Sequence, residues 1–221
     1  MVERIKPRAS RRREVKMYQL IITLGYINPP IWRRLLVRSD ANLAMLHSII
    51  QVCMGWTNSH LHQFTIGKRV YSDPDFEIGE DFGGPPVLDE GKSILMEIAP
   101  REKAKIIYEY DFGDSWRHLI LVEKILDKQD SEDIVAECID GSRACPPEDC
   151  GGIGGYANLL EIIKNPRHEE YESMMDWLGG KFDPEAFDRE KINKYLRKLK
   201  QPLLSEMQLA KILMKRDGYK E

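Results

Sequence analysis

The chain has 221 residues, of which 42% are hydrophobic and 31% charged, and its formal net charge is −3. This length suits one large domain or one domain with a helical extension, and the composition is typical of a soluble globular protein. No apolar run reaches the roughly 20 residues that span a bilayer, and the basic N-terminus lacks the apolar stretch of a signal peptide. We therefore predict a cytoplasmic protein, in which the four cysteines stay thiols or bind metal.

The charge is unevenly distributed along the chain. Residues 1–16 hold seven Lys and Arg against two acids, residues 189–221 hold ten against four, and the middle is strongly acidic. Basic ends can neutralise the phosphates of a nucleic acid, and Arg11, Arg12 and Arg13 are the candidate contacts. The alternative is a disordered basic leader over residues 1–15 and an ordinary solvated helix face at the other end.

The first predicted element is a β-hairpin. Residues 17–25 and 31–37 have the composition of strands, and an Asn-Pro-Pro stretch between them must interrupt the pairing because proline donates no backbone hydrogen bond. In the second strand we expect Trp32 and Leu36 on the inner face.

A helix is predicted next. Apolar residues recur at helical spacing over 43–53, with Ser39 or Asp40 as the N-cap and Gly55 at the end. His47 lies on or beside the apolar face, where a lone histidine is more often packed in the core than a ligand.

Short strands and a long connection follow. Residues 60–66 alternate as a strand, and a Gly-Lys turn leads to a brief strand at 70–71. Residues 72–92 predict a long acidic loop, a kind of segment that is often functional or disordered. Residues 93–98 suit a brief helix or strand.

The central prediction is a second hairpin. Residues 106–111 and 116–123 alternate with period two, and Asp-Phe-Gly-Asp supplies the turn. Because both faces carry apolar residues, we expect central strands that are covered on each side.

The C-terminal part is predicted to be helical. Helices are expected near 155–165, 171–179 and 188–199, and a short basic helix from Ser205. The fold class is therefore α+β, with a β-grasp-like mixed sheet and one crossing helix, the element order of ubiquitin, followed by a helical part packed on the sheet. The boundaries are a leader at 1–15, a β-grasp-like core at 16–126, a Cys/Pro/Gly-rich connection at 127–155 and a helical part at 156–221, which together form one continuous globular domain.

One candidate binding cluster surrounds the central hairpin, and its members are His60, His62, Asp111, Asp114, Trp116 and His118. Carboxylates and imidazoles together can hold a divalent metal or share acid–base work. His60 and His62 fall on one face of a strand, because side chains repeat every two residues. The alternative is that the aspartates shape the turn through hydrogen bonds to the backbone while the histidines pack beside tryptophans.

A second candidate is a set of three cysteines, Cys138, Cys145 and Cys150. Zinc sites usually contain closer Cys-x-x-Cys pairs, so the spacing is a weak match. Three converging thiols could still bind zinc if His118 or His168 supplied a fourth ligand. Cys145 and Cys150 could instead form a disulfide, or all three could be buried inert thiols. Zinc or another divalent cation is thus the cofactor class left open.

Several longer phrases resemble a known family: Pro29-Pro-Ile-Trp-Arg-Arg34, Leu46-His47 through Gly55-Trp56, Ser59-His-Leu-His-Gln-Phe64, Tyr110-Asp-Phe-Gly-Asp-Ser-Trp-Arg-His118, Arg143-Ala-Cys-Pro-Pro-Glu-Asp-Cys-Gly-Gly152, and Phe182-Asp-Pro-Glu-Ala-Phe187 followed by Ile192-Asn193. Together they resemble the plasmid Ri open-reading-frame-three family, also labelled insertion-element passenger proteins of TnpR type, over residues 17–197. The label implies a recombinase, but neither a serine nor a tyrosine nucleophile site is visible. The family supplies no settled activity to carry over.

The functional hypothesis is a cytoplasmic binding or accessory module, associated with mobile elements, that contacts protein or nucleic acid. The alternative is a metal-assisted hydrolase or other enzyme that uses the aspartates and histidines of the central hairpin. No small-molecule substrate is identifiable from the sequence, and whether any reaction is catalysed stays open.

Overall fold

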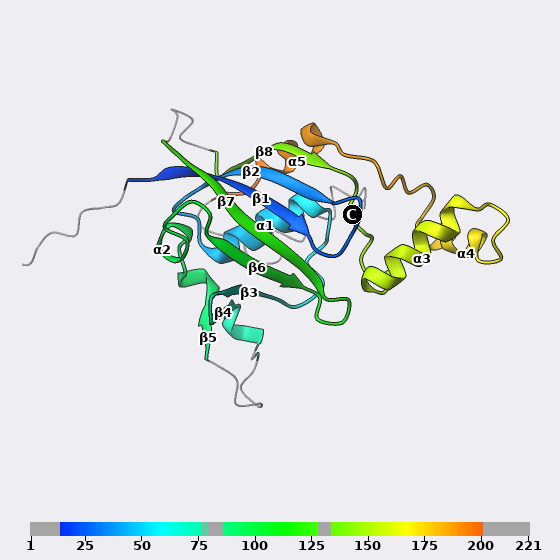
Figure 1. Cartoon of the computed structure of the whole chain (residues 1–221), viewed down its shortest axis with the longest axis horizontal. Coiled ribbons are helices and arrows are strands. Elements are labelled where there is room, and N and C mark those ends of the chain that lie inside the picture. The colour runs from blue at the N-terminus through cyan, green and yellow to red at the C-terminus, as the bar shows by residue number, and fades with distance from the viewer. Residues whose placement is uncertain (1–13, 77, 79–85, 128–133, 201–221) are drawn as a thin grey trace, which may run out of the picture.

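The computed structural model describes residues 14–76, 78, 86–127 and 134–200, and one eight-stranded sheet dominates it (Figure 1). The strands are β1 (Lys16–Leu24), β2 (Trp32–Arg38), β3 (His62–Ile66), β4 (Arg69–Ser72), β5 (Val87–Asp89), β6 (Lys105–Tyr110), β7 (Trp116–Asp127) and β8 (Ala136–Ser142). Their order across the sheet is β5-β4-β3-β6-β7-β1-β2-β8. Every neighbouring pair is antiparallel except β4 and β5, which are parallel. The predicted hairpins therefore lie in one mixed sheet.

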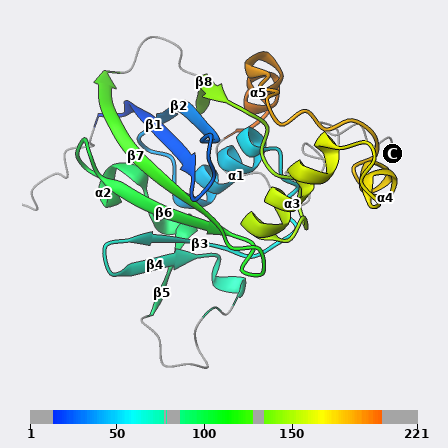
Figure 2. The same ribbon diagram turned by 45° about the vertical axis from the view of Figure 1, so that its right-hand side comes forward.

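Helices cover one face of this sheet and extend past one end of it. They are α1 (Leu43–Met54), α2 (Leu95–Ile98), α3 (Gly152–Lys164), α4 (Tyr171–Trp177) and α5 (Arg189–Leu196), with short 3₁₀ turns η1 (Pro74–Phe76) and η3 (Glu90–Lys92). Helix α1 crosses the inner face, and α5 contacts both β8 and α1. Figure 2 shows α3 and α4 beyond the end of the sheet at which β6 turns into β7. The α+β class predicted from the sequence is confirmed.

The first hairpin forms as predicted, but its second strand has the opposite orientation. Trp32 and Leu36 are only half-buried, whereas Arg33, Leu35 and Val37 are buried against the core. The sequence-based assignment failed because an arginine at position 33 was not considered as a core residue. Its buried hydrogen bonds, described below, explain how the core accepts it.

Helix α1 is buried on nearly all sides because the sheet covers one side while η3 and α5 contact it elsewhere. Its N-cap is Asn42, whose side chain accepts a hydrogen bond from the Met45 N–H at 2.8 Å, and not Ser39 or Asp40. The end at Gly55 is as predicted, in the left-handed conformation that glycine adopts easily (φ +99°).

The outer face of the central hairpin is only partly covered. Ile107 is 40% exposed and Leu119 is 39% exposed. The strands are central, as expected, but the prediction that both of their faces would be covered is wrong. Within the described residues, the outer face of β6 and β7 is partly exposed.

The connection after the central hairpin contains a strand that was not predicted. Strand β8 pairs with β2 at the edge of the sheet, with a register shift between Arg34 and Leu35. Residues 1–13, which are most of the leader predicted at 1–15, and the expected helix from Ser205 lie outside the described residues. Within the described ranges, no helix is both long enough and apolar enough to cross a membrane.

Candidate functional site

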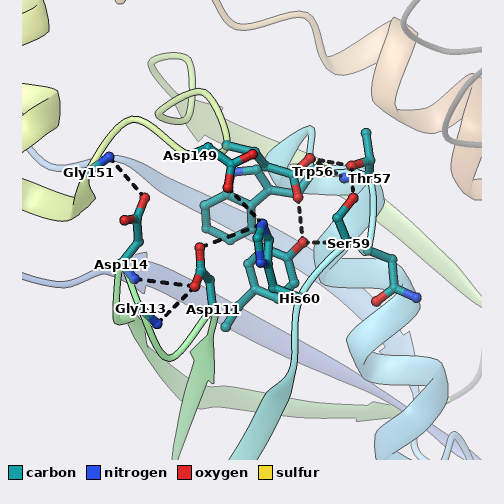
Figure 3. Close-up of polar contacts among 12 residues, drawn as sticks. Trp56, Thr57, Ser59, His60, Asp111, Gly113, Asp114, Asp149 and Gly151 are labelled. Carbon is teal, nitrogen blue, oxygen red and sulfur yellow. Dashed lines mark hydrogen bonds and ion pairs between the residues drawn. The ribbon is translucent and has the colours of Figure 1, made fainter.

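Three ligand-type side chains meet where the tip of the β6–β7 hairpin touches two other segments (Figure 3). His60 precedes β3, Asp111 follows β6, and Asp149 comes from the Cys-Pro-Pro-Glu-Asp-Cys loop before α3. His60 Nε2 lies 3.1 Å from Asp149 Oδ1 and 3.7 Å from Asp111 Oδ2. One ligand atom from each residue falls within 4.8 Å of the others. We call this set the junction cluster.

The backbone of the hairpin tip sets the position of Asp111. Its φ is +58°, a left-handed conformation that aspartate tolerates better than most residues. Its Oδ1 accepts hydrogen bonds from the N–H groups of Gly113 at 2.9 Å and Asp114 at 3.3 Å, while its own N–H donates to the Leu61 carbonyl at 2.9 Å. The other carboxylate oxygen, Oδ2, therefore faces His60. The predicted turn-shaping role of Asp111 and its place in the cluster are both present.

Asp114 fixes the same hairpin to the start of α3. Its Oδ2 accepts a hydrogen bond from the Gly151 N–H at 3.2 Å. A side chain at Gly152 would meet the Asp114 carbonyl oxygen at 2.7 Å, so the two backbones pack directly on each other. Asp114 is thus a second turn and docking residue, and it is not part of the junction cluster.

Glu148, next to Asp149, ties the loop to the segment between α1 and β3. The Tyr110 hydroxyl donates to Glu148 Oε1. The Thr57 hydroxyl donates to Oε2, and the Thr57 N–H donates to the same oxygen at 2.9 Å. Burial, followed by the nearby Glu148 carboxylate, raises the pKa of Tyr110 well above its ordinary value, so the phenol stays a donor. The loop that carries Asp149 is therefore held in place by its neighbour.

The junction cluster has the chemistry of a cation site. One imidazole and two carboxylates suit divalent ions such as Zn²⁺ or Mn²⁺. His60 Nε2 is buried yet has no aligned hydrogen-bond partner among the described residues, although Asp149 is close. Three protein ligands would leave further coordination positions for water or a substrate.

His62 is the first residue of β3, whereas His60 precedes the strand, so the predicted histidine pair on one strand face does not form. Its Nε2 lies 2.9 Å from Glu90 Oε2, and its ring stacks on His47 at 3.5 Å between centroids. Burial lowers the pKa of both histidines to about 3 and raises the pKa of Glu90 to about 7. Below about pH 7 Glu90 is therefore mostly protonated beside a neutral His62, and neither residue is part of the junction cluster.

His118 and Trp116 are core residues on the inner face of β7. His118 Nδ1 lies 3.0 Å from the Trp116 carbonyl, and the ring meets Trp56 edge-on at 5.3 Å. Burial lowers the pKa of His118 to about 3. The structure therefore places both residues away from the junction cluster, packed beside tryptophan as the alternative interpretation held.

The three cysteines do not share a ligand group in the described structure. Cys138 is buried on β8, Cys145 Sγ lies 3.0 Å from the Met54 sulfur, and Cys150 is half-buried near α3. None of the three forms a disulfide. Burial raises the pKa of Cys138 to about 11 and that of Cys150 to about 12, which disfavours the thiolate that binds metal.

Sequence reasoning missed Asp149 and Glu90. Asp149 stands in a phrase quoted for the family resemblance, but it is about forty residues from Asp111 and carried no ligand spacing of its own. Glu90 was counted as part of the long acidic loop predicted at residues 72–92. The candidate nucleic-acid residues Arg11, Arg12 and Arg13 lie outside the described residues.

Comparison with known proteins gives consistent matches. The model of a family described as plasmid pRiA4b ORF-3-like protein matches residues 16–191. The uncharacterised protein y4hQ of Sinorhizobium fredii (strain NBRC 101917 / NGR234) is 32% identical over 177 residues, which are 80% of this chain and 88% of that protein. The crystal structure of a protein of unknown function, MM3350, from Methanosarcina mazei Go1 has a TM-score of 0.70 at 34% identity and covers 80% of this chain and 97% of that one. Neither description names an activity.

Proposed function

We propose that this chain, which belongs to the plasmid pRiA4b ORF-3-like family, is a binding module that holds a divalent cation at the junction cluster. The descriptions of the relatives above state no activity, so the proposal is argued from the site itself. The observation that carries the proposal is the approach of His60, Asp111 and Asp149 to within 4.8 Å of one another from three separate segments. A cation bound there would cross-link the segment before β3, the central hairpin and the loop before α3.

The surroundings of the cluster support a binding site. Asp111 is oriented by two backbone N–H groups, and Asp149 is positioned by the hydrogen bonds of the adjacent Glu148. Neither arrangement needs the cation to form, so the ligands would be organised in advance. The module would present this end of the sheet to a protein or a nucleic acid, and an accessory role in mobile elements is part of the same proposal.

Cation binding can be tested on the full chain after treatment with a chelator and dialysis. Added Mn²⁺ or Zn²⁺ should bind with a stoichiometry of one in calorimetry. It should also stabilise the protein by about 2.7 kcal/mol at one hundred times its Kd, which is several degrees in Tm. His60→Ala and Asp149→Asn should abolish both effects, because each removes one ligand.

Matched controls separate the site from general effects of charge. His168→Ala and Asp176→Asn change an outlying histidine and an exposed aspartate far along the chain, and they should bind the cation as the wild type does. Equal uptake by His60→Ala and the wild type would refute the proposal, as would the absence of any uptake.

A metal-assisted hydrolase is the second candidate, and the open coordination positions of a three-ligand site favour it. It predicts that the cation-loaded protein cleaves an activated phosphodiester such as bis-p-nitrophenyl phosphate, and that Asp149→Asn loses this turnover. Stoichiometric cation binding without turnover would leave the binding module and exclude phosphodiester hydrolysis at this site.

A further inference from the structure

A stripe of lysines follows the outward side of α5 and the turn after it. Lys191, Lys194 and Lys198 are exposed and spaced by three and four residues, which places them on one side of a helix. Leu196, on the other side, is buried, and the Lys198 ammonium lies 4.4 Å from the centroid of the Tyr195 ring. Among the described ion pairs, none joins these lysines to a carboxylate.

The stripe leads into a groove. A cavity of about 840 Å³ lies between the end of α1, the loop that carries Cys145, and the segment from Trp177 to Ile192. Lys191 belongs to both the stripe and the groove, and Lys181 is a further exposed cation on the groove wall. Trp177, at the same wall, is 50% exposed.

The acids of the groove already have partners, and its lysines do not pair with them. Glu148 accepts hydrogen bonds from Thr57 and Tyr110, and Asp188 accepts one from the Lys191 N–H at 2.8 Å as the N-cap of α5. These bonds come from neutral donors and leave both carboxylates charged. Arg33, Lys181 and Lys191 nevertheless outnumber the two acids in the lining, so the groove is net positive next to an exposed indole ring. A positive groove beside an exposed aromatic ring suits a ligand with a phosphate backbone and unpaired bases.

We propose that the lysine stripe and the groove bind single-stranded nucleic acid. The phosphates would follow Lys198, Lys194 and Lys191 into the groove, and a base would stack on Trp177. A duplex offers no free base face for this indole, and the acidic middle of the chain would repel a duplex that lies across it. The inference rests on the proposed role as a binding module and adds its partner class, without using the junction cluster.

The test uses the full chain and a fluorescent oligothymidylate of about 15 nucleotides at low salt, with anisotropy as the readout. The triple variant Lys191→Gln, Lys194→Gln, Lys198→Gln should bind more weakly, and its slope of log affinity against log salt should be smaller by about 2. Trp177→Ala should lose about ten-fold in affinity with an unchanged salt slope, because stacking releases no counterions.

Two control variants address other cations. Lys68→Gln, Arg69→Gln, Lys105→Gln removes three exposed charges from the β3–β4 turn, β4 and β6 and should leave affinity and slope unchanged. Arg11→Gln, Arg12→Gln, Arg13→Gln measures the N-terminal segment, and the inference is wrong if that variant alone loses binding.

Three further outcomes overturn the inference. The first is no binding of the oligonucleotide at low salt, and the second is equal affinity for a duplex of the same length. The third is that polyglutamate, which competes through charge alone, displaces the oligonucleotide equally well from the wild type and from Trp177→Ala. Cation binding that survives any of these results would leave the proposed cation site standing, so the two proposals fail separately.

Discussion

Arg33 brings a full positive charge into the core. It is 3% exposed, and no ion pair of the described chain joins it to a carboxylate. Its Nε–H donates to the Cys53 carbonyl at 2.9 Å, and its other N–H groups donate to the carbonyls of Trp32, Ser142 and Arg143, each at 2.8 Å. Because carbonyls near the end of a helix carry partial negative charge, α1 supplies part of the compensation. One side chain thereby joins β2, α1 and the segment after β8.

The four carbonyl contacts of the Arg33 guanidinium predict that lysine substitutions at Arg33 and at its neighbour Arg34 change the free energy of unfolding by different amounts. Arg33→Lys should destabilise the protein by about 3 kcal/mol, because an ammonium cannot reach four carbonyls and stays buried. Arg34→Lys, on the opposite face of β2, breaks a partly exposed pair with Glu123 and should cost less than about 1 kcal/mol. Urea unfolding followed by tryptophan fluorescence measures both. Equal losses would show that the buried carbonyl contacts are not what matters.

Individual side chains show what the sequence could predict about the site. His60 and Asp111 were identified because a strand period and turn chemistry are local patterns. The separation of His62 from His60 was not predictable, because it depends on Glu90, which reaches β3 from a loop about thirty residues away. Asp149 was missed for the same reason: its partners come from the tertiary fold, and no spacing along the chain indicates them.

At the scale of elements, the first turn of α3 is built around glycines that allow close backbone contact. A Cβ at Gly155 would lie 1.8 Å from the Cys150 carbonyl oxygen, whereas a Cβ at Gly154 would meet no atom within 4 Å. In an ordinary helix, alanine is favoured over glycine by about 1 kcal/mol. The two positions should therefore respond to the same substitution with opposite signs.

We expect Gly155→Ala to destabilise the protein by about 2 kcal/mol or more, because the helix start must move away from the loop. Gly154→Ala should be neutral or stabilising by up to about 1 kcal/mol. Gly155→Ala should also weaken cation uptake, since Cys150 adjoins Asp149. Thermal unfolding and calorimetry with Mn²⁺ check these expectations, and destabilisation by both alanines would argue against the packing explanation.

Elements with strong local patterns were predicted well, and elements defined by pairing were not. The end of α1 at Gly55 and the helix expected near 188–199, observed as α5, follow from local sequence patterns. Strand β8 was missed because Glu137 and Asp140 interrupt its apolar residues, and its identity as a strand comes from pairing with β2. The inner face of β2 was misassigned because hydrophobicity alone placed Trp32 inside.

At the scale of the whole molecule, buried histidines link the layers of the fold. His47 on α1 lies 2.8 Å from the Tyr108 hydroxyl on β6 and stacks on His62 of β3, which contacts Glu90 of η3. His118 is buried separately on β7. All three imidazoles stay neutral in the folded state because burial lowers each pKa to about 3. Protonation in the unfolded chain therefore works against the whole fold.

Acid should destabilise the protein well above the pH at which ordinary carboxylates titrate. Between pH 4.5 and 6.5 the His62–Glu90 pair carries one proton in both states, because burial raises the pKa of Glu90 to about 7 while that of His62 falls to about 3. His47 and His118 bind protons only when unfolded in this window, so the free energy of unfolding should fall with falling pH by up to about 2.7 kcal/mol per unit. His118→Gln, which keeps a donor for the Trp116 carbonyl, should halve this slope, whereas His168→Gln, outside the core, should leave it unchanged. Urea titrations across this range measure all three proteins. Identical slopes for His118→Gln and the wild type would mean that His118 is not held neutral by burial.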